Sequence, residues 1–166
     1  MYNKIMNVIE LFKKKKNKKI EAIKLALNAE VFNKNGEIKK SINLLNKAIN
    51  FDKENDSLFY ERALCFLKQK QYKKALSDIN NALKINKNIY YYHLVKSDVC
   101  HFLNKNEEEN ESIQKAIKLF NKPHLYYEKR IEQSIQNEND KFTNLYKLRL
   151  KKLIEFENTL IQEITM

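Results

Sequence analysis

The residues that could do chemistry in this chain gather first in one short stretch. His93, Asp98, Cys100 and His101 fall close together, and such side chains can bind a metal or transfer protons. Asp98 and His101 are three residues apart, so they would be neighbours on one helix face. No third residue with metal-ligand spacing accompanies them, and glycine-rich phosphate loops and nucleophile-elbow patterns are absent. The sequence therefore predicts no catalytic centre, no metal site and no cofactor, so the chain is predicted not to be an enzyme.

A second group is the basic run KKKKNKK, which contains Lys13, Lys14, Lys15, Lys16, Lys18 and Lys19. Residues 1–20 carry seven lysines and one glutamate, within a chain of net charge +11. Such a cluster can attach to RNA or to an anionic membrane surface. No aromatic residue interleaves the lysines, which argues against stacking on single strands. A solvated helix is the first interpretation, and electrostatic attachment to nucleic acid or membrane is the alternative.

Composition favours an all-α fold. Gly36 and Pro123 are the single glycine and the single proline among 166 residues, which leaves few of the turns that all-β folds need. Cys65 and Cys100 are too few for a disulfide framework, so both are predicted to be buried thiols. No apolar run reaches the length that spans a bilayer, and the first residues do not resemble a secretory signal. We therefore expect a cytoplasmic protein.

The elements that carry these residues repeat with a constant period along the chain. The windows are 22–55, 56–89 and 90–123, and small and large apolar residues recur at the same places in each. The positions include Ala29, Ala63 and Ser97; Phe32, Phe66 and Cys100; Leu45, Ile79 and Ile113; and Ala48, Ala82 and Ala116. Polar stretches at 33–37, 68–71 and 104–107 interrupt the pattern midway through each window. Each window therefore predicts two short helices joined by a tight turn.

A helix pair with a period of about 34 residues resembles the tetratricopeptide repeat (TPR). The resemblance implies an α-solenoid of antiparallel helix pairs that winds into a right-handed superhelix. It places a small residue of the second helix at Ser41, Ala75 and Glu109, where two helices cross closely. Because Glu109 is too large for such a crossing, we expect the third repeat to be splayed or end-exposed there.

The flanking segments suggest caps for the three repeats. Residues 1–21 are predicted to form a basic N-terminal cap helix, with apolar residues up to Phe12 covering the first repeat. Residues 124–166 are predicted to form a degenerate helix, with Arg130 near a small-residue position, followed by a long amphipathic helix. This long helix is interpreted as a cap on the last repeat. A homodimer formed through its far end is the alternative.

The resemblance also implies that the first helix of each repeat lines a concave groove, where a peptide or partner helix docks. The implied groove residues are Ile23, Ala26, Leu27, Glu30, Asn33, Ser57, Tyr60, Glu61, Leu64, Leu67, Tyr91, Leu94, Val95, Asp98 and His101. Tyr60 and Tyr91 would be the anchors, since tyrosine offers a large contact area with few torsions to freeze. The alternative is that the C-terminal helix folds back and occupies this groove.

Residues 59–83 are similar to the middle repeat of chaperone-binding TPR domains, which clamp a C-terminal carboxylate. The clamp positions of that family correspond here to Ala26, Glu30, Glu61, Tyr91 and Val95, so the clamp residues are absent. We therefore predict an adaptor that holds an apolar or basic segment of a partner protein. Two alternatives stay open: a subunit that binds RNA or membrane through Lys13–Lys19, and a chaperone cofactor that recognises something other than the carboxylate.

Overall fold

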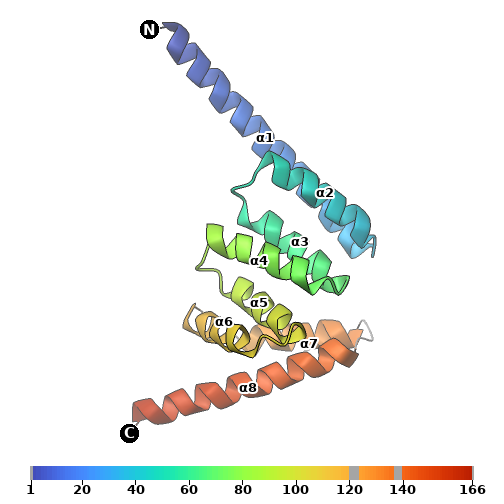
Figure 1. Ribbon diagram of the computed structural model, residues 1–166, viewed down its shortest axis with the longest axis vertical. Helices are drawn as coiled ribbons and strands as arrows, with labels where there is room; N and C mark the ends of the chain where they lie inside the picture. Colours follow the sequence, from blue (N-terminus) through green and yellow to red (C-terminus); the bar gives the residue numbers. More distant parts are fainter. Residues whose placement is uncertain (1, 120–123, 137–139, 166) are drawn as a thin grey trace.

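The computed structural model describes the backbone of residues 2–119, 124–136 and 140–165, in which helices alternate with short turns and no strand occurs. The helices are α1 (Tyr2–Lys34), α2 (Ile38–Phe51), α3 (Asp56–Lys68), α4 (Tyr72–Ile85), α5 (Tyr90–Phe102), α6 (Asn106–Leu119), α7 (His124–Gln136) and α8 (Asp140–Thr165). Successive antiparallel pairs stack along one axis, with the two ends of the chain at opposite ends of the stack (Figure 1). The all-α solenoid expected from the sequence is confirmed.

The helix boundaries follow the sequence period beyond the third window. Helices α3, α5 and α7 begin at Asp56, Tyr90 and His124, one period apart, and α4, α6 and α8 keep the same step. The segment after residue 123 is therefore a fourth helix pair in register with the others. At the other end, α1 passes without a break through residues 21 and 22. The division into 1–21, 22–123 and 124–166 stays a prediction.

The turn inside each of the first three pairs has one geometry. Gly36, Lys70 and Asn104, again one period apart, adopt positive φ angles of 79°, 58° and 56°. After each of them, a backbone N–H donates across the turn to the preceding helix: Glu37 to the Phe32 carbonyl at 2.8 Å, Gln71 to Phe66 at 2.9 Å, and Lys105 to Cys100 at 2.9 Å. This is the Schellman motif that ends a helix through one left-handed residue.

The core runs along the stack as three clusters, each of which joins one pair to the next helix or helices. The first contains Ala22, Ala29, Leu45 and Leu58, the second Ala63, Ala75, Ile79 and Val95, and the third Leu94, Ala116, Tyr127 and Leu153. A single helix pair cannot bury its apolar face alone, so each pair depends on its neighbour. Cys65 and Cys100 are buried free thiols, as predicted.

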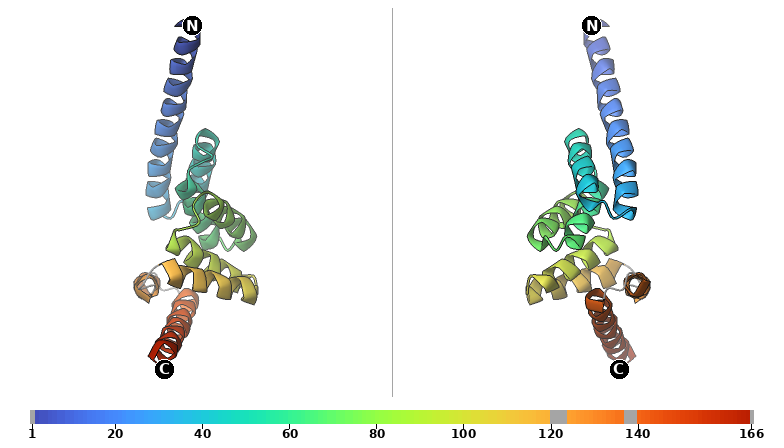
Figure 2. Two further views of the ribbon diagram at one scale, coloured as in Figure 1. Left: turned by 90° about the vertical axis from the view of Figure 1, so that its left-hand side faces the viewer. Right: turned by 90° about the vertical axis from the view of Figure 1, so that its right-hand side faces the viewer.

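The first half of α1 departs from the expected cap. It projects past the end of α2 and stands clear of the stack in both views of Figure 2. Phe12, expected to cover the first repeat, has an exposed fraction of 69%. The reason is length, because α2 has 14 residues and cannot run beside all 33 residues of α1.

Candidate functional site

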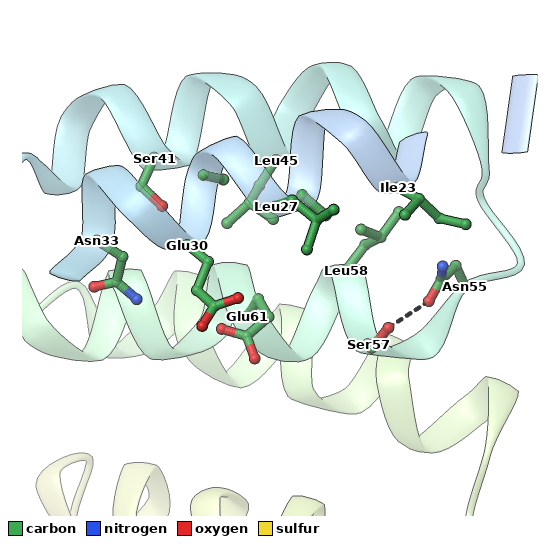
Figure 3. A pocket seen from close by; sticks show the side chains of 12 residues that line it. Ile23, Leu27, Glu30, Asn33, Ser41, Leu45, Asn55, Ser57, Leu58 and Glu61 are labelled. Carbon is green, nitrogen blue, oxygen red and sulfur yellow. Dashed lines mark hydrogen bonds between the residues drawn. The ribbon is translucent and has the colours of Figure 1, made fainter. Parts of the chain in front are cut away.

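A hollow of about 240 Å³ opens between α1, α2 and the start of α3. Figure 3 shows its walls, with Ile23, Leu27 and Glu30 from α1 and Leu58 and Glu61 from α3. The full lining is Ile23, Ala26, Leu27, Ala29, Glu30, Asn33, Ser41, Leu45, Asn55, Ser57, Leu58 and Glu61. The structure thus brings together all five groove residues predicted for the first repeat, together with Ser57 and Glu61 of the second. The sequence interpretation did not name Asn55 or Leu58 as lining residues.

Two carboxylates give this hollow an acidic wall. Glu30 and Glu61 project from facing helices into the same space (Figure 3). Glu30 forms an ion pair with Lys34 at 2.6 Å, whereas in the described part of the chain Glu61 has no hydrogen bond or ion pair. Burial raises the pKa of Glu61, the neighbouring Glu30 raises it further, and Lys68 lowers it. A positive group that entered the hollow would offset the repulsion between the two carboxylates and favour the ionised form of Glu61.

The tyrosines predicted as anchors are engaged with each other. Tyr60 lies edge-on to Tyr91, with ring centroids 5.2 Å apart, and its ring is 4.8 Å from that of Tyr92. Tyr60, Leu64 and Tyr91 are half-buried and pack on the second core cluster. Burial is also the main cause that raises the pKa of the Tyr60 hydroxyl. These residues therefore leave only part of their surface for a partner.

Three further predicted groove residues are wrong as contact residues. Leu94, Val95 and Asp98 are fully buried. Leu94 belongs to the third core cluster, which also contains Tyr127 of α7 and Leu145, Tyr146 and Leu153 of α8. The alternative in which the C-terminal helix occupies the groove stays a prediction.

A buried ion pair explains the misfit at Glu109. This residue is buried like Ser41 and Ala75 at the equivalent positions, so the expectation of a splayed or exposed site is wrong. Arg149 of α8 donates to the Glu109 carboxylate at 2.6 Å and to the Ser97 carbonyl oxygen at 3.0 Å. Where earlier pairs place small residues at the crossing, the third and fourth pairs are joined by long charged side chains.

Asp98 lies in the same buried region. Its two carboxylate oxygens have no hydrogen-bond partner in the described part of the chain. Burial raises its pKa to about 7, although the nearby Arg149 and Arg130 lower it. Arg130 itself donates to the Tyr146 hydroxyl at 2.8 Å and lies over that ring. Periodicity gave no sign of Arg149, because it belongs to the pair outside the three windows. The only sequence signal was the carboxylate at position 109.

The histidines and lysines that the sequence singled out do not join the hollow. His93 contacts the Lys87 carbonyl oxygen at 2.9 Å, and His101 lies 3.3 Å from the Glu109 carboxylate. Among the residues that the structure describes, no group of three or more His, Cys, Asp or Glu side chains could hold a metal. The lysines from Lys13 to Lys19 are exposed and surround all sides of α1. No helix in the described ranges is long and apolar enough to cross a membrane.

Comparison with known proteins finds the same repeat. No protein-family model matches the chain. A TPR repeat-containing protein of Methanocaldococcus jannaschii is 28% identical over 124 residues, which cover 74% of this chain. The chain spans 22% of the length of that relative.

Solved structures show the architecture over most of the chain. The second TPR of Spaghetti (RPAP3), bound to an HSP90 peptide, superposes with a TM-score of 0.63 at 23% identity, covering 65% of this chain and 99% of that one. The Arabidopsis OM64 TPR domain superposes with a TM-score of 0.62 at 19% identity, covering 81% and 98%. With the periodic helix pairs described above, these likenesses show that the chain has the tetratricopeptide-repeat fold.

Proposed function

We propose that this chain is a protein-interaction adaptor that binds a segment of a partner protein in the hollow between α1, α2 and α3. The observation that carries the proposal is an exposed apolar wall, Ile23 and Leu27, beside the half-buried carboxylate of Glu61. Burial of apolar surface supplies affinity, and a carboxylate in a partly desolvated site selects a positive group. The occupant is an apolar helix or extended peptide that carries a lysine or arginine.

The acidic wall argues against the kind of peptide found in the fold neighbours. The second TPR of Spaghetti was solved with the peptide SRMEEVD, which is acidic and ends in a carboxylate. In this chain Glu30 and Glu61 would face that negative charge, and like charges brought together in a desolvated site cost several kcal/mol. A chaperone cofactor would have to recognise a different part of its chaperone.

The test measures binding of the purified chain to an array of apolar peptides, each made with and without a lysine or arginine. Wild type should select the basic apolar peptides and leave SRMEEVD unbound. The variant Glu30→Lys/Glu61→Lys should lose the selected peptides at least tenfold, with an unchanged melting temperature. The matched control is Glu54→Lys/Glu111→Lys, which makes the same charge change at two exposed sites outside the hollow. Equal binding by all three proteins would overturn the groove assignment.

A second candidate function rests on the exposed lysines of the projecting half of α1. They could attach the chain to RNA or to an anionic membrane. Such binding should weaken steeply between about 50 and 200 mM salt because counterions are released, whereas peptide binding in the apolar hollow should change little. The proposed homodimer through the far end of α8 concerns side chains from residue 156 onward, which lie outside the described residues.

A further inference from the structure

One face of α1 is apolar and exposed. It consists of Phe12, Ile20, Ile23, Leu27 and Val31, with exposed fractions of 69%, 42%, 52%, 59% and 56%, and of Lys16 between the first two. The residues that α1 packs into the core, such as Ala22 and Ala29, lie on the opposite side of the helix. We call the exposed set the α1 stripe.

The spacing along the α1 stripe reads the same in both directions. From Phe12 to Val31 the successive steps are four, four, three, four and four, with the midpoint between Glu21 and Ala22. In a two-fold symmetric contact, each residue meets its counterpart reciprocally in the other copy. Two antiparallel copies of α1 would therefore place Phe12 opposite Val31, Ile20 opposite Ile23, and the methylene stem of Lys16 over Leu27.

The shape of α1 leaves this face open to another chain. The helix has 33 residues, about 50 Å at 1.5 Å per residue, and its first half extends past α2 (Figures 1 and 2). Because the helix is unbroken, the chain cannot fold the projecting half back onto its own second half. A long partner helix alongside α1 would cover both halves of the α1 stripe at once.

Charge selects the antiparallel orientation. A parallel pair would bring the two lysine clusters into contact. In the antiparallel pair the two Lys16 positions are separated by about 16 Å along the axis, roughly two Debye lengths at physiological ionic strength. Each Lys16 also lies about one turn from the level of Glu30 in the other copy, close enough for an ion pair.

We propose that the α1 stripe is a self-association surface, on which a second copy of this chain docks its own α1 antiparallel in a two-fold dimer. The dimer covers Ile23 and Leu27, which also line the hollow. Self-association and partner binding therefore compete, and the dimer is a state in which the hollow is closed. This inference goes beyond the proposed adaptor function and does not depend on it.

Sedimentation equilibrium of the full chain tests the surface. Wild type should be a dimer at micromolar concentration, and Ile20→Glu should raise its dissociation constant at least tenfold. Leu11→Glu is the matched control, because Leu11 is also an exposed apolar residue of α1, with an exposed fraction of 67% against 42% for Ile20, but lies about 150° around the helix from the middle of the α1 stripe. It should leave the dimer intact. A monomeric wild type, or a dimer that withstands Ile20→Glu, would overturn the proposal.

Cross-linking tests the register. Phe12→Cys and Val31→Cys proteins are mixed under oxidising conditions, and the buried Cys65 and Cys100 leave the new thiols as the accessible ones. The mixture should give a covalent dimer many times faster than either variant alone. If Phe12→Cys alone cross-links faster than the mixture, the antiparallel pairing is refuted. The two hypotheses can be tested separately, because Ile20 does not line the hollow and Glu61 does not belong to the α1 stripe. Peptide binding measured with Ile20→Glu therefore tests the adaptor function without the dimer.

Discussion

Arg149 and Glu109 form the ion pair that holds the fourth helix pair against the third, and both side chains are almost fully buried. Removing one partner of such a pair leaves the other as an unpaired buried charge and lowers the free energy of unfolding by about 3–5 kcal/mol. Replacing both partners with apolar residues often leaves stability unchanged. We expect Arg149→Met to lower the free energy of unfolding by about that amount. The double variant Glu109→Ala/Arg149→Met should recover most of it, since alanine occupies the equivalent position 75. Thermal and urea unfolding measure both.

The control for that cycle is Lys151→Met, which removes an exposed cation from the same helix. Exposed ion pairs contribute at most about 1 kcal/mol, so this variant should melt within a few degrees of wild type. If Arg149→Met behaves like Lys151→Met, the ion pair does not hold α8 in place.

Asp98 should make stability depend on pH. Burial raises its pKa in the folded state to about 7, above its value of about 3.9 in the unfolded chain. The folded state therefore holds the proton more tightly, and this contribution to stability is full below about pH 4 and is lost as the pH rises to about 7. Asp98→Asn, which stays neutral, should flatten this part of the melting-temperature profile, between about pH 4 and pH 7. An unchanged slope would show that Asp98 is ionised in the folded protein throughout.

At the scale of the elements, the turns inside the helix pairs share one backbone requirement but have different residues. Gly36 adopts the left-handed conformation without strain because it has no Cβ atom, whereas Lys70 adopts the same conformation although it has one. An ordinary residue in this conformation costs about 1 kcal/mol. Lys70→Gly should therefore raise the free energy of unfolding by up to about 1 kcal/mol, and Asn104→Gly by less, since asparagine tolerates this region.

The reverse change supplies the counter-test in the first turn. A methyl group added at Gly36 would meet no atom within 4 Å, so Gly36→Ala measures backbone strain alone. It should lower the free energy of unfolding by about 1 kcal/mol. If chemical denaturation gives the same sign for Gly36→Ala and Lys70→Gly, turn strain is not what limits these connections.

At the scale of the whole molecule, the stack is unequal along its length. Helix α3 contributes to the first and second core clusters, α4 to the second, and α5 to the second and third, while the first half of α1 projects from the end (Figure 2). Short helices without tertiary contacts are marginally stable in water. In hydrogen exchange of the monomeric Ile20→Glu variant, amides of residues 10–20 should exchange orders of magnitude faster than those of α3 to α5. Wild type at concentrations that form the dimer should protect them.

That comparison has a built-in control, because α4 faces no proposed partner. Its amides should exchange at the same rate in both proteins. Protection confined to residues 10–31 would support the α1 dimer, whereas uniform protection would indicate a general change in stability.

Much of the fold could be predicted because it depends on contacts that repeat. Ala29 and Ala63 recur one period apart, and each is buried where a neighbouring helix approaches closely, so local spacing contains the information about packing. The groove positions Ile23, Leu27 and Glu61 came instead from the resemblance to the TPR, and all three line the hollow beside α1. In the third repeat, Leu94 and Asp98 occupy groove positions by period but are fully buried, and Arg149 of α8 donates to the carbonyl oxygen of the neighbouring Ser97.

The sequence by itself determined the helix pairs, their turns and the acidic, apolar character of the first groove positions. These follow from residue type and from spacing along a helix. Only the tertiary structure decided that Arg149 reaches Glu109 across 40 residues, that Leu94 and Asp98 of α5 are buried, and that one face of α1 is exposed. Such contacts join segments that do not share the period. They depend on how long each helix is and on which helices lie side by side, and a periodic pattern in the sequence contains neither.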